Sequence, residues 1–502
     1  MADKVDEYIA QTIREGDKGS KLLHERCKPT LKNSQLVEII SEGMGGIAVL
    51  RPPKNCLIAV HSSGGDPGEK NLERYVYSFI NRLVSDSQRI GAEPLGIGDI
   101  IDASSMDLNT IARIGDELRE RAGEYSLPIL NGELADLGAR VNCEANISGT
   151  MISAIPKTSK FVVKVPGIFV EDGVTYAVFY PEGKLVFINL DGIGTKTDFY
   201  EKLIEQLQAI RDVPLDSVYN PELLPCGVED FAAMNLDDAA KLGAEAKVLS
   251  GVIETRGQIP VKLIEEKLRR IAAKMGVLGI LQHEEVGDRI RGYREGAATY
   301  NISGSSVSVI DEGRLRNLPK PKEGNTLVAI CGLPNPRSNG ISSKRRIMIE
   351  LFGENWHKTP AGKIFMEYLS SPSTILYPVF SELLKEGLAT SVFHNSGGAY
   401  NGKLARPLAN HGLYVELKDL FEPDWREVAL AAYSPTTRDA YAKYPMGTDG
   451  FVATSKPEEA IALIEQRGLK ARAVGKLEKL SDRTGVKLTA YNGQEVDFSG
   501  KD

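Results

Sequence analysis

The sequence has few cysteines and no long hydrophobic run. Its five cysteines stand singly, with no CxxC pair, at Cys27, Cys56, Cys143, Cys226 and Cys331. Zinc sites and disulfide frameworks use clustered cysteines, so neither is expected, and a reducing cytoplasm is the expected location. The chain also lacks the run of about 18 apolar residues that spans a bilayer, and its first residues lack the pattern of an export signal. We therefore expect neither membrane insertion nor export.

An excess of positive charge and several common catalytic motifs are missing as well. The formal net charge is -7 and the sequence pI is near 5.7, which disfavours a general polyanion-binding surface and nucleic acid as a partner. The chain contains no HExxH, no GxxxxGK[ST] and no nucleophile elbow. Zinc hydrolases, Walker-type ATPases and α/β-hydrolases are thereby disfavoured. Any phosphate site must be local and of another kind.

An internal repeat is present in the first two thirds of the chain. QRIGAEPLGIGDII, which contains Gly91, resembles AKLGAEAKVLSGVI, which contains Gly243, at an offset of 152 residues (243 minus 91). CEANISGTMISAI around Asn146 resembles ATYNISGSSVSVI around Asn301 at an offset of 155 (301 minus 146). An amphipathic helix is predicted between the two matches in each copy. Ordered matches at nearly constant offset indicate a duplicated domain.

Three domains are expected from this pattern. Residues 1–160 and 161–322 form the two copies, and residues 323–502 match neither. The linker NLPKPKEGN, which contains two prolines and a glycine, ends the repeat. The last part opens with the strand-like TLVAICGL, has a predicted helix over 378–386, and closes with KLTAYNGQEVDF, whose Asn-Gly pair predicts a type I′ hairpin. An α+β domain is the expected result.

The sharpest local signal is the run LVFINLDGIGTKTD. Its apolar and β-branched residues predict a strand that leads directly into the turn from Asp191 to Lys196. Glycines let the backbone approach a phosphate, the lysine supplies charge, and the carboxylate suits a hard cation. A tight turn with solvated ends is the alternative interpretation.

Three aspartates follow in the predicted helix GVEDFAAMNLDDAAKLGAE. Asp230 and Asp238 are eight residues apart, so they fall close to one face after two turns, and Asp237 lies beside them. Carboxylates on one face repel one another unless a cation lies between them. The apolar AAM and AAKL indicate a packed helix, which favours magnesium ligands over a solvated acidic face.

Two turns in the last domain are suited to binding an anion. In GLPNPRSNGISSKRR, the backbone amides at a helix amino end could bind a phosphate. In SVFHNSGGAYNGKLARPL, a histidine at a strand end precedes a glycine turn, although such a histidine is more often structural than catalytic. The residues concerned are Arg337, Ser338, Asn339, Gly340, His394, Ser396, Gly397 and Gly398.

In this order, these elements resemble the aminoimidazole ribonucleotide synthetase family, also called phosphoribosylformylglycinamidine cyclo-ligases. The resemblance covers most of 161–502 and, more faintly, 40–160. It implies N-terminal domains that pair into a β-barrel with two related ATP sites, and here one chain would supply both halves. The expected fold is therefore α+β: a duplicated ATP-binding domain that forms an intramolecular β-barrel flanked by helices, followed by a C-terminal α+β domain. A monomeric pseudo-dimer or a homodimer is expected.

The resemblance also implies roles for individual residues. The implied ATP-binding residues are Asp191, Gly192, Gly194, Thr195, Lys196 and Asp237, and the implied magnesium ligands are Asp191, Asp230 and Asp238. The implied substrate-binding residues are Arg337, Ser338, Asn339, Gly340, Ser396, Gly397 and Gly398. Lys196, Glu133 and His394 are the implied catalytic residues.

The two copies differ at the implied ATP site. The first copy reads VHSSGGDPGEK where the second reads DGIGTKTD, and Ser78 stands in the place of Asp230, although Asp86 matches Asp238 (238 minus 86 is 152). The first copy keeps the family's acidic run as NGELAD, with Glu133, whereas the second copy reads QHEEVG and keeps only Glu284. We expect one ATP site, in the second copy, with Glu133 reaching it across the barrel.

The function implied by the resemblance is an ATP- and magnesium-dependent ligase of purine biosynthesis. Its small-molecule substrate would be formylglycinamidine ribonucleotide and its product aminoimidazole ribonucleotide. His394 is followed by Asn-Ser-Gly-Gly, and Arg337 replaces a histidine, so substrate identity is the open question. Another ATP-dependent phosphoryl-transfer enzyme of the same architecture and a non-catalytic nucleotide-binding scaffold are the alternatives. Intact Asp191, Lys196 and Asp230 argue against the scaffold.

Overall fold

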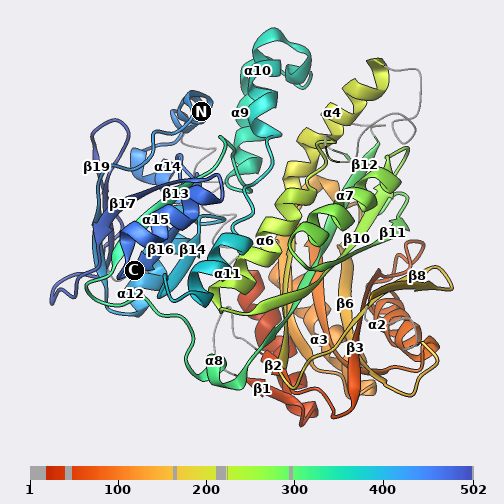
Figure 1. The fold of residues 1–502 in the computed structure, drawn as a ribbon. Helices are drawn as coiled ribbons and strands as arrows, with labels where there is room; N and C mark the ends of the chain where they lie inside the picture. Colours follow the sequence, from red (N-terminus) through yellow and green to blue (C-terminus); the bar gives the residue numbers. More distant parts are fainter. Residues whose placement is uncertain are drawn as a thin grey trace. The chain divides into compact units, whose positions relative to one another are not determined.

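The chain forms two compact units in a computed structural model (Figure 1). The model describes residues 18–39, 48–161, 167–210, 222, 224–292 and 298–499. The N-terminal unit lies within Ala10–Asn235 and Ala244–Arg316, and the C-terminal unit within Leu236–Gly243 and Asn317–Asp502. Helix α6 (Val228–Lys241) contains a boundary between them.

Two six-stranded sheets make up the N-terminal unit. The first sheet has the order β5 (Ile129–Asp136), β4 (Glu93–Ala103), β6 (Ala145–Pro156), β3 (Cys56–Gly64), β8 (Val174–Phe179) and β7 (Gly167–Glu171). The second has the order β11 (Leu278–Glu285), β10 (Glu245–Arg256), β12 (Thr299–Ile310), β9 (Leu185–Gly192), β2 (Ala48–Leu50) and β1 (Val37–Ile39). In each sheet the first pair is parallel and the remaining pairs are antiparallel. Equal strand order and equal pairing confirm the predicted duplication.

The two copies exchange their leading strands. β1 and β2 precede β3 in the chain, yet β2 pairs with β9 of the other sheet through Val49 opposite Phe187. Reciprocally, β7 and β8 precede β9, yet β8 pairs with β3 through Val60 opposite Ala177. Because each sheet is completed by strands from the other copy, neither sheet is complete without the other half of the sequence.

The sheets face each other and enclose a largely apolar interior, as the predicted intramolecular barrel requires. The cluster between them takes residues from both sheets, among them Leu50, Ile58, Val60, Ile100, Ile152, Val186, Ile188, Leu190, Val248 and Val307. Hydroxyl pairs cross between the sheets, with Ser62 Oγ 2.6 Å from Ser250 Oγ. Among the described residues no backbone ladder joins the two sheets. Side chains bridge one edge instead, where Asn131 Nδ2 donates to the carbonyl of Ile188 at 3.3 Å.

Helices cover the outer face of each sheet. The first sheet carries α2 (Leu72–Arg89) and α3 (Leu108–Glu124), and the second carries α4 (Thr197–Ile210), the first part of α6 and α7 (Val261–Lys274). The same close contact recurs on both sheets. A Cβ at Gly149 of β6 would lie 2.7 Å from the ring of Phe79, and one at Gly304 of β12 would lie 3.0 Å from the ring of Phe231. The backbone of the neighbouring strand is closer still, with the carbonyl oxygens of Gly98 and Ser250 at 2.4 and 2.2 Å from these two Cβ positions. Glycine is therefore needed at both places, first by the neighbouring strand and then by the helix.

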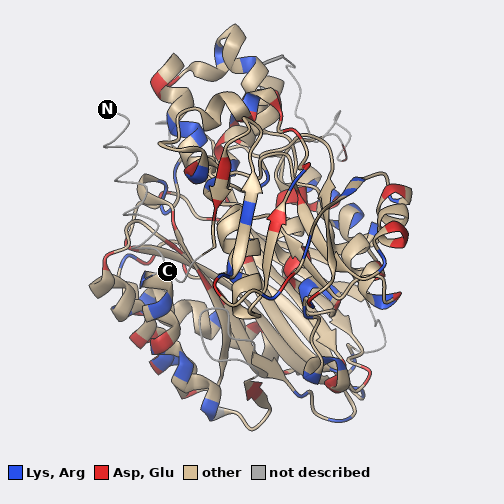
Figure 2. Cartoon of the chain, turned by 90° about the vertical axis from the view of Figure 1, so that its left-hand side faces the viewer, with Lys and Arg blue, Asp and Glu red and all other residues tan. Residues whose placement is uncertain are grey.

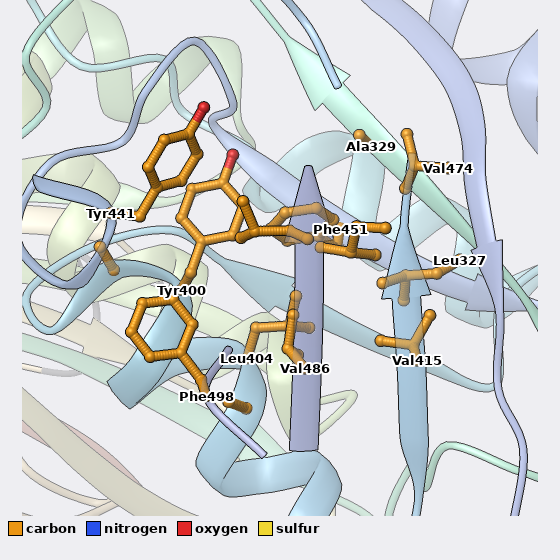
Figure 3. Close-up of a cluster of buried hydrophobic side chains, with 14 of the residues drawn as sticks. Leu327, Ala329, Tyr400, Leu404, Val415, Tyr441, Phe451, Val474, Val486 and Phe498 are labelled. Carbon is orange, nitrogen blue, oxygen red and sulfur yellow. The ribbon is translucent and has the colours of Figure 1, made fainter. Parts of the chain in front are cut away.

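The C-terminal unit has two sheets of its own, an α+β arrangement as predicted. One has the order β14 (Ser391–His394), β16 (Gly450–Thr454), β13 (Thr326–Cys331) and β17 (Lys470–Lys476), and the other has β15 (Tyr414–Leu417), β18 (Gly485–Thr489) and β19 (Glu495–Asp497). The main helices are α9 (Ile341–Phe352), α10 (Pro360–Leu369), α11 (Tyr377–Lys385), α12 (Arg406–Asn410), α13 (Trp425–Ala431), α14 (Thr437–Lys443) and α15 (Pro457–Gln466). Tyr400, Phe451, Val486 and Phe498 pack between the sheets and helices in the core (Figure 3).

The closing hairpin is present, but its turn differs from the expected type. β18 and β19 pair as predicted, with Thr489 opposite Glu495. Gly493 has a positive φ of 78°, whereas Asn492 does not, and the amide of Gly493 donates to the carbonyl of Ala490. A type I′ turn needs both central residues at positive φ, so the type I′ prediction was wrong. The loop is longer than a two-residue hairpin turn and contains one left-handed glycine, Gly493.

The distribution of charged residues and the hydropathy of the helices fit the composition of the sequence. Acidic and basic residues are interspersed on the helices of the described chain (Figure 2). No helix in the described part of the chain has the length and apolar character needed to cross a membrane.

A polar cluster of four side chains lies buried between the two barrel sheets. Asn146 Nδ2 is 2.7 and 2.8 Å from the two carboxylate oxygens of Glu254, and Asn301 Nδ2 is 2.8 Å from Asp102 Oδ2. Each asparagine therefore bonds the acid of the other copy. Burial raises the pKa of Asp102 to about 8, and the nearby charge of Glu254 acts in the same direction. The pKa of Glu254 is also raised, first by burial.

Stability is expected to fall with pH because of Asp102. The folded protein binds its proton up to about pH 8, whereas an unfolded aspartate releases it near 3.8, so the unfolded state is favoured as pH rises between these values. Asp102→Asn should remove up to about 1.4 kcal/mol per pH unit from the slope of the unfolding free energy. Urea unfolding between about pH 5 and pH 8 measures this slope. The exposed Asp288→Asn is the control, and equal slopes in wild type and Asp102→Asn would contradict the assignment.

Candidate functional site

The DGIGTK run forms a strand-to-helix turn in the N-terminal unit. Asp191 is the last residue but one of β9, and its Oδ1 accepts a hydrogen bond from the amide of Gly192 at 2.8 Å. A short 3-10 turn over Gly194–Lys196 then leads into α4. Gly194 has a φ of 52°, which favours glycine, whereas at Gly192 a Cβ would meet only ordinary contacts at 3.5 Å. Protein packing therefore explains one glycine of this turn and leaves the other open to a ligand.

Lys196 and Asp230 form a fully buried ion pair beneath this turn. Lys196 Nζ lies 2.6 Å from Asp230 Oδ1, with both side chains 0% exposed. The hydroxyl of Tyr200 donates to the other carboxylate oxygen, Oδ2. Burial is the first cause that raises the pKa of Tyr200, so the phenol stays protonated. Sequence reasoning missed Tyr200, although its position four residues after Lys196 on α4 places both on one helix face.

The magnesium ligands Asp191, Asp230 and Asp238 stay a prediction, and two of them lie on one helix. Asp230 and Asp238 lie on α6, and eight helical residues span about 12 Å, so one cation cannot contact both directly. Asp230 is engaged by Lys196 and Tyr200. Among the described residues no group of three or more His, Cys, Asp and Glu side chains is arranged to hold a metal.

Glu133 lies on the strand next to the one that carries Asp191. β5 belongs to the first sheet and β9 to the second, and they meet through the bond from Asn131 to Ile188. The side chain of Leu137, just beyond β5, approaches the turn, since a Cβ at Gly194 would lie 3.8 Å from it. The structure thus brings the Glu133 strand to the turn, while the contact of Glu133 itself stays a prediction.

Arg337 is an internal clamp of the C-terminal unit. Its guanidinium lies 3.1 Å from Asp237 Oδ2 and 3.4 Å from Asp449 Oδ1, and it donates to the carbonyl of Thr374. Asp237 in turn accepts hydrogen bonds at 2.8 Å from the amides of Leu376 and Tyr377, where α11 begins. Burial raises the pKa of Asp237 to about 7, against the opposite effect of Arg337. Both side chains therefore contact protein groups, and Asp449 is a partner that sequence reasoning missed.

The two predicted anion-binding turns meet in the C-terminal unit. Asn339 Nδ2 donates to the carbonyl of Ser396 at 3.0 Å, and Ser396 Oγ is 3.2 Å from His394 Nε2. Gly340 and Gly398 have positive φ, and a Cβ at Gly340 would lie 2.4 Å from the ring of Tyr444. These two glycines are structural. A Cβ at Gly397 would meet nothing within 4 Å, so this position lies open.

Two oxygen atoms in the turn at Asn339 have no hydrogen-bond partner among the described residues. They are Ser338 Oγ and Asn339 Oδ1, both shielded from solvent. Buried polar atoms are normally satisfied, and an unsatisfied pair beside an open glycine indicates a place where a ligand can bind. Of the predicted substrate residues, this group includes Ser338 and Asn339, whereas Arg337 is used elsewhere.

His394 is held as a neutral base. Its Nε2 lies 3.0 Å from Asp238 Oδ1, and burial lowers the pKa of His394 to about 3 despite that carboxylate. Burial acts to raise the pKa of Asp238, but Lys241, Lys403 and His394 together hold it well below its ordinary value. An ionised Asp238 and a neutral imidazole result at neutral pH. Asp238 thus contacts Lys241 and His394.

The comparisons with known proteins agree with the sequence resemblance. No family model matches the chain. A phosphoribosylformylglycinamidine cyclo-ligase of Brevibacillus brevis is 26% identical over 279 residues, covering 53% of this chain and 76% of that protein. The Streptococcus pyogenes protein of the same name is 28% identical over 183 residues, 36% of this chain and 53% of its own length. The chain is a relative of the phosphoribosylformylglycinamidine cyclo-ligases.

Among solved structures, a thiamine-monophosphate kinase from Stenotrophomonas maltophilia aligns with 66% of this chain and 93% of its own length. The TM-score is 0.41 and the identity 12%, which is too low to support a conclusion about function. The relation to the cyclo-ligases therefore depends on the sequence relatives.

Arg337→Lys should destabilise the C-terminal unit by about 3 kcal/mol. Arg337 bonds Thr374 and Asp449 through Nη1 and Asp237 through Nη2, whereas lysine has one nitrogen in place of these two, so at least one buried carboxylate loses its partner. Chemical unfolding followed by circular dichroism measures the loss, with the exposed Arg406→Lys as the matched control. Wild-type stability in Arg337→Lys would show that the clamp contributes little.

Proposed function

We propose that this chain is an ATP-dependent ligase that converts formylglycinamidine ribonucleotide to aminoimidazole ribonucleotide. In general terms, the names of the curated relatives support an ATP-dependent enzyme. The observation that carries the specific proposal is the turn after β9, where Gly192 is free of any steric demand from the protein and Asp191 stands at the strand end. Backbone amides at such a turn, followed by the amino end of α4, are suited to phosphate.

A magnesium ion at the turn after β9 would be bound by both the protein and the nucleotide. Carboxylate oxygens at Asp191 and Glu133 are hard donors, and magnesium is usually held by one or two carboxylates together with phosphate oxygens. That mode needs no cluster of three acidic side chains, in agreement with the described residues. When bound, the ion would neutralise negative charge on the transferred phosphoryl group. Asp230 and Asp238 would not be direct ligands of this ion.

Lys196 acts from beneath the turn. Its ammonium is fully buried against Asp230, so a direct contact with phosphate requires the side chain to leave that partner. In its observed place, it anchors the first turn of α4 and with it Gly194 and Thr195. We therefore assign Lys196 a positioning role first and a phosphate contact second.

The substrate phosphate is proposed to bind the joined turns of the C-terminal unit. Ser338 Oγ and Asn339 Oδ1 have unused hydrogen-bonding capacity, and the open Gly397 lets a ligand approach the backbone beside Ser396. The serine hydroxyl can donate to a phosphate oxygen, whereas the amide oxygen can accept from a ribose hydroxyl. His394 holds Ser396 and Asp238 in place through its Nε2 side.

The proposed chemistry needs little covalent help from the protein. The formyl oxygen attacks the γ-phosphorus of ATP, ADP leaves, and the formamide nitrogen loses its proton to give an iminophosphate. The amidine nitrogen that carries the ribose then attacks the same carbon, and phosphate leaves. The nitrogen loses one proton as the imidazole ring forms. Orientation of the two reactants and electrostatic stabilisation account for most of the catalysis in such transfers.

A different acceptor within the same reaction class is the second candidate. The family's histidine is replaced by Arg337, whose guanidinium is sealed among Asp237, Asp449 and Thr374. A substrate contact made by the family's histidine is therefore not made here by its replacement. Release of ADP and formation of aminoimidazole ribonucleotide, assayed together, distinguish the two: ADP release that requires another acceptor would replace the first proposal.

Asp191→Asn should weaken binding of magnesium-ATP by about 100-fold, because the amide is a poorer ligand for a hard cation. Isothermal titration with a non-hydrolysable ATP analogue and magnesium measures the change. Asp288→Asn, an exposed residue of the same unit, is the control. Unchanged affinity in Asp191→Asn would remove this residue from the site.

Glu133→Gln should lower turnover by about 10- to 100-fold, although the residue belongs to the first copy. The reason is that β5 lies beside β9, so the carboxylate can serve the site of the second copy. Steady-state kinetics measure kcat, and Glu93→Gln, an exposed position on β4, is the matched control. Wild-type turnover in Glu133→Gln would contradict a cross-barrel role.

A further inference from the structure

The first copy has a place equivalent to the proposed nucleotide site. Ser63 lies opposite Gly149 of β6, as Asp191 lies opposite Gly304 of β12, so Ser63 occupies the position of Asp191. Glu284 on β11 lies opposite Glu254, the counterpart of Asp102, whereas Glu133 on β5 lies opposite Ile100. Glu284 is therefore two residues along the strand from the counterpart of Glu133, on the same face of the strand. We call Ser63, Gly64, Arg82 and Glu284 the first-copy pseudo-site.

One arginine nitrogen is surrounded by oxygen atoms in this pseudo-site. Arg82 Nη1 lies 3.2 Å from each carboxylate oxygen of Glu284 and 3.2 Å from the carbonyl oxygen of Gly64. Ser63 Oγ donates to Glu284 Oε1 at 3.3 Å. Glu284 is only 12% exposed, so its charge is largely withdrawn from water. A positive charge with three oxygen neighbours takes the place that a hard cation would take.

The arginine has no counterpart in the second copy. Position 82 corresponds to Met234 (234 minus 82 is 152), which is apolar and buried. The end of the barrel that carries Asp191 therefore has no built-in cation at this position, whereas the end that carries Ser63 has one. Serine at position 63 in place of an acid and arginine at position 82 in place of methionine both make this end of the barrel more positive.

We propose that Arg82 is a resident cation that masks a divalent-cation site made by Glu284, Ser63 and the carbonyl of Gly64. The pseudo-site consequently binds no metal nucleotide, and the chain binds one nucleotide. This one-nucleotide stoichiometry rests on the proposed function, whereas the masked cation site does not. Glu284 also lies near Glu254, whose pKa its charge raises, so a positive partner at this end offsets repulsion between two acids.

Manganese binding without nucleotide tests the masked site. Arg82→Ala, and Arg82→Ala combined with Ser63→Asp, should bind one more Mn²⁺ per chain than the wild type, counted by electron paramagnetic resonance titration. Arg74→Ala, an exposed arginine of the same helix, is the control and should match the wild type. Equal Mn²⁺ stoichiometry in wild type and both Arg82 variants would overturn the proposal.

Thermal unfolding separates this role from an ordinary ion pair. Arg82→Ala should lower Tm because Glu284 loses its partner, and added Mn²⁺ should restore it. The double variant Arg82→Ala with Glu284→Gln should show no such Mn²⁺ effect. A lowered Tm without rescue by Mn²⁺ in Arg82→Ala would mean that the pair is merely structural.

Nucleotide stoichiometry then distinguishes this inference from the proposed function. One ATP analogue per wild-type chain supports both, and two would overturn the role of Arg82. No binding of the analogue would reject the proposed function, while the Mn²⁺ gain would still decide whether Arg82 masks a cation site.

Discussion

The burial of one face of each six-stranded sheet against the other is the constraint on which the N-terminal unit depends. Neither sheet is self-sufficient, because β1 and β2 complete the second sheet and β7 and β8 complete the first. Apolar side chains from both sheets fill the space between them, and the few polar ones bond across it in reciprocal pairs. Separation of the copies would therefore expose an apolar face and leave buried carboxylates without donors.

This pairing explains how two copies of one domain can have different roles. Once the copies are fused in one chain, each end of the barrel can change independently, since no symmetry forces both ends to carry the same residues. One end keeps an acid at the end of β9 beside a glycine turn. The other end has a serine in that place and an arginine held by Glu284. At the Asp191 end the buried cation is Lys196, which is paired with Asp230.

The C-terminal unit is organised around buried charges rather than around a repeated fold. Arg337 joins Asp237 to Asp449, and Asp237 caps the start of α11. The same region brings the turn at Asn339 to the turn at Ser396. Beside this clamp, Arg337 Nε, Ser338 Oγ and Asn339 Oδ1 have no hydrogen-bond partner among the described residues.

The sequence by itself determined the duplication, the strand before Asp191, the packed helix with three aspartates and the two glycine turns, because these are local patterns with a fixed period or offset. It also indicated that the ends of the repeat are unequal, since Ser78 and the VHSSGGD run are visible without a structure. Only the tertiary structure decided which charges pair. Asp237 was read as an ATP ligand, yet its partners are Arg337, 100 residues away, and two amides more than 130 residues away. The exchange of β1, β2, β7 and β8, and the contact between Arg82 and Glu284, likewise depend on how distant segments meet, which no local pattern encodes.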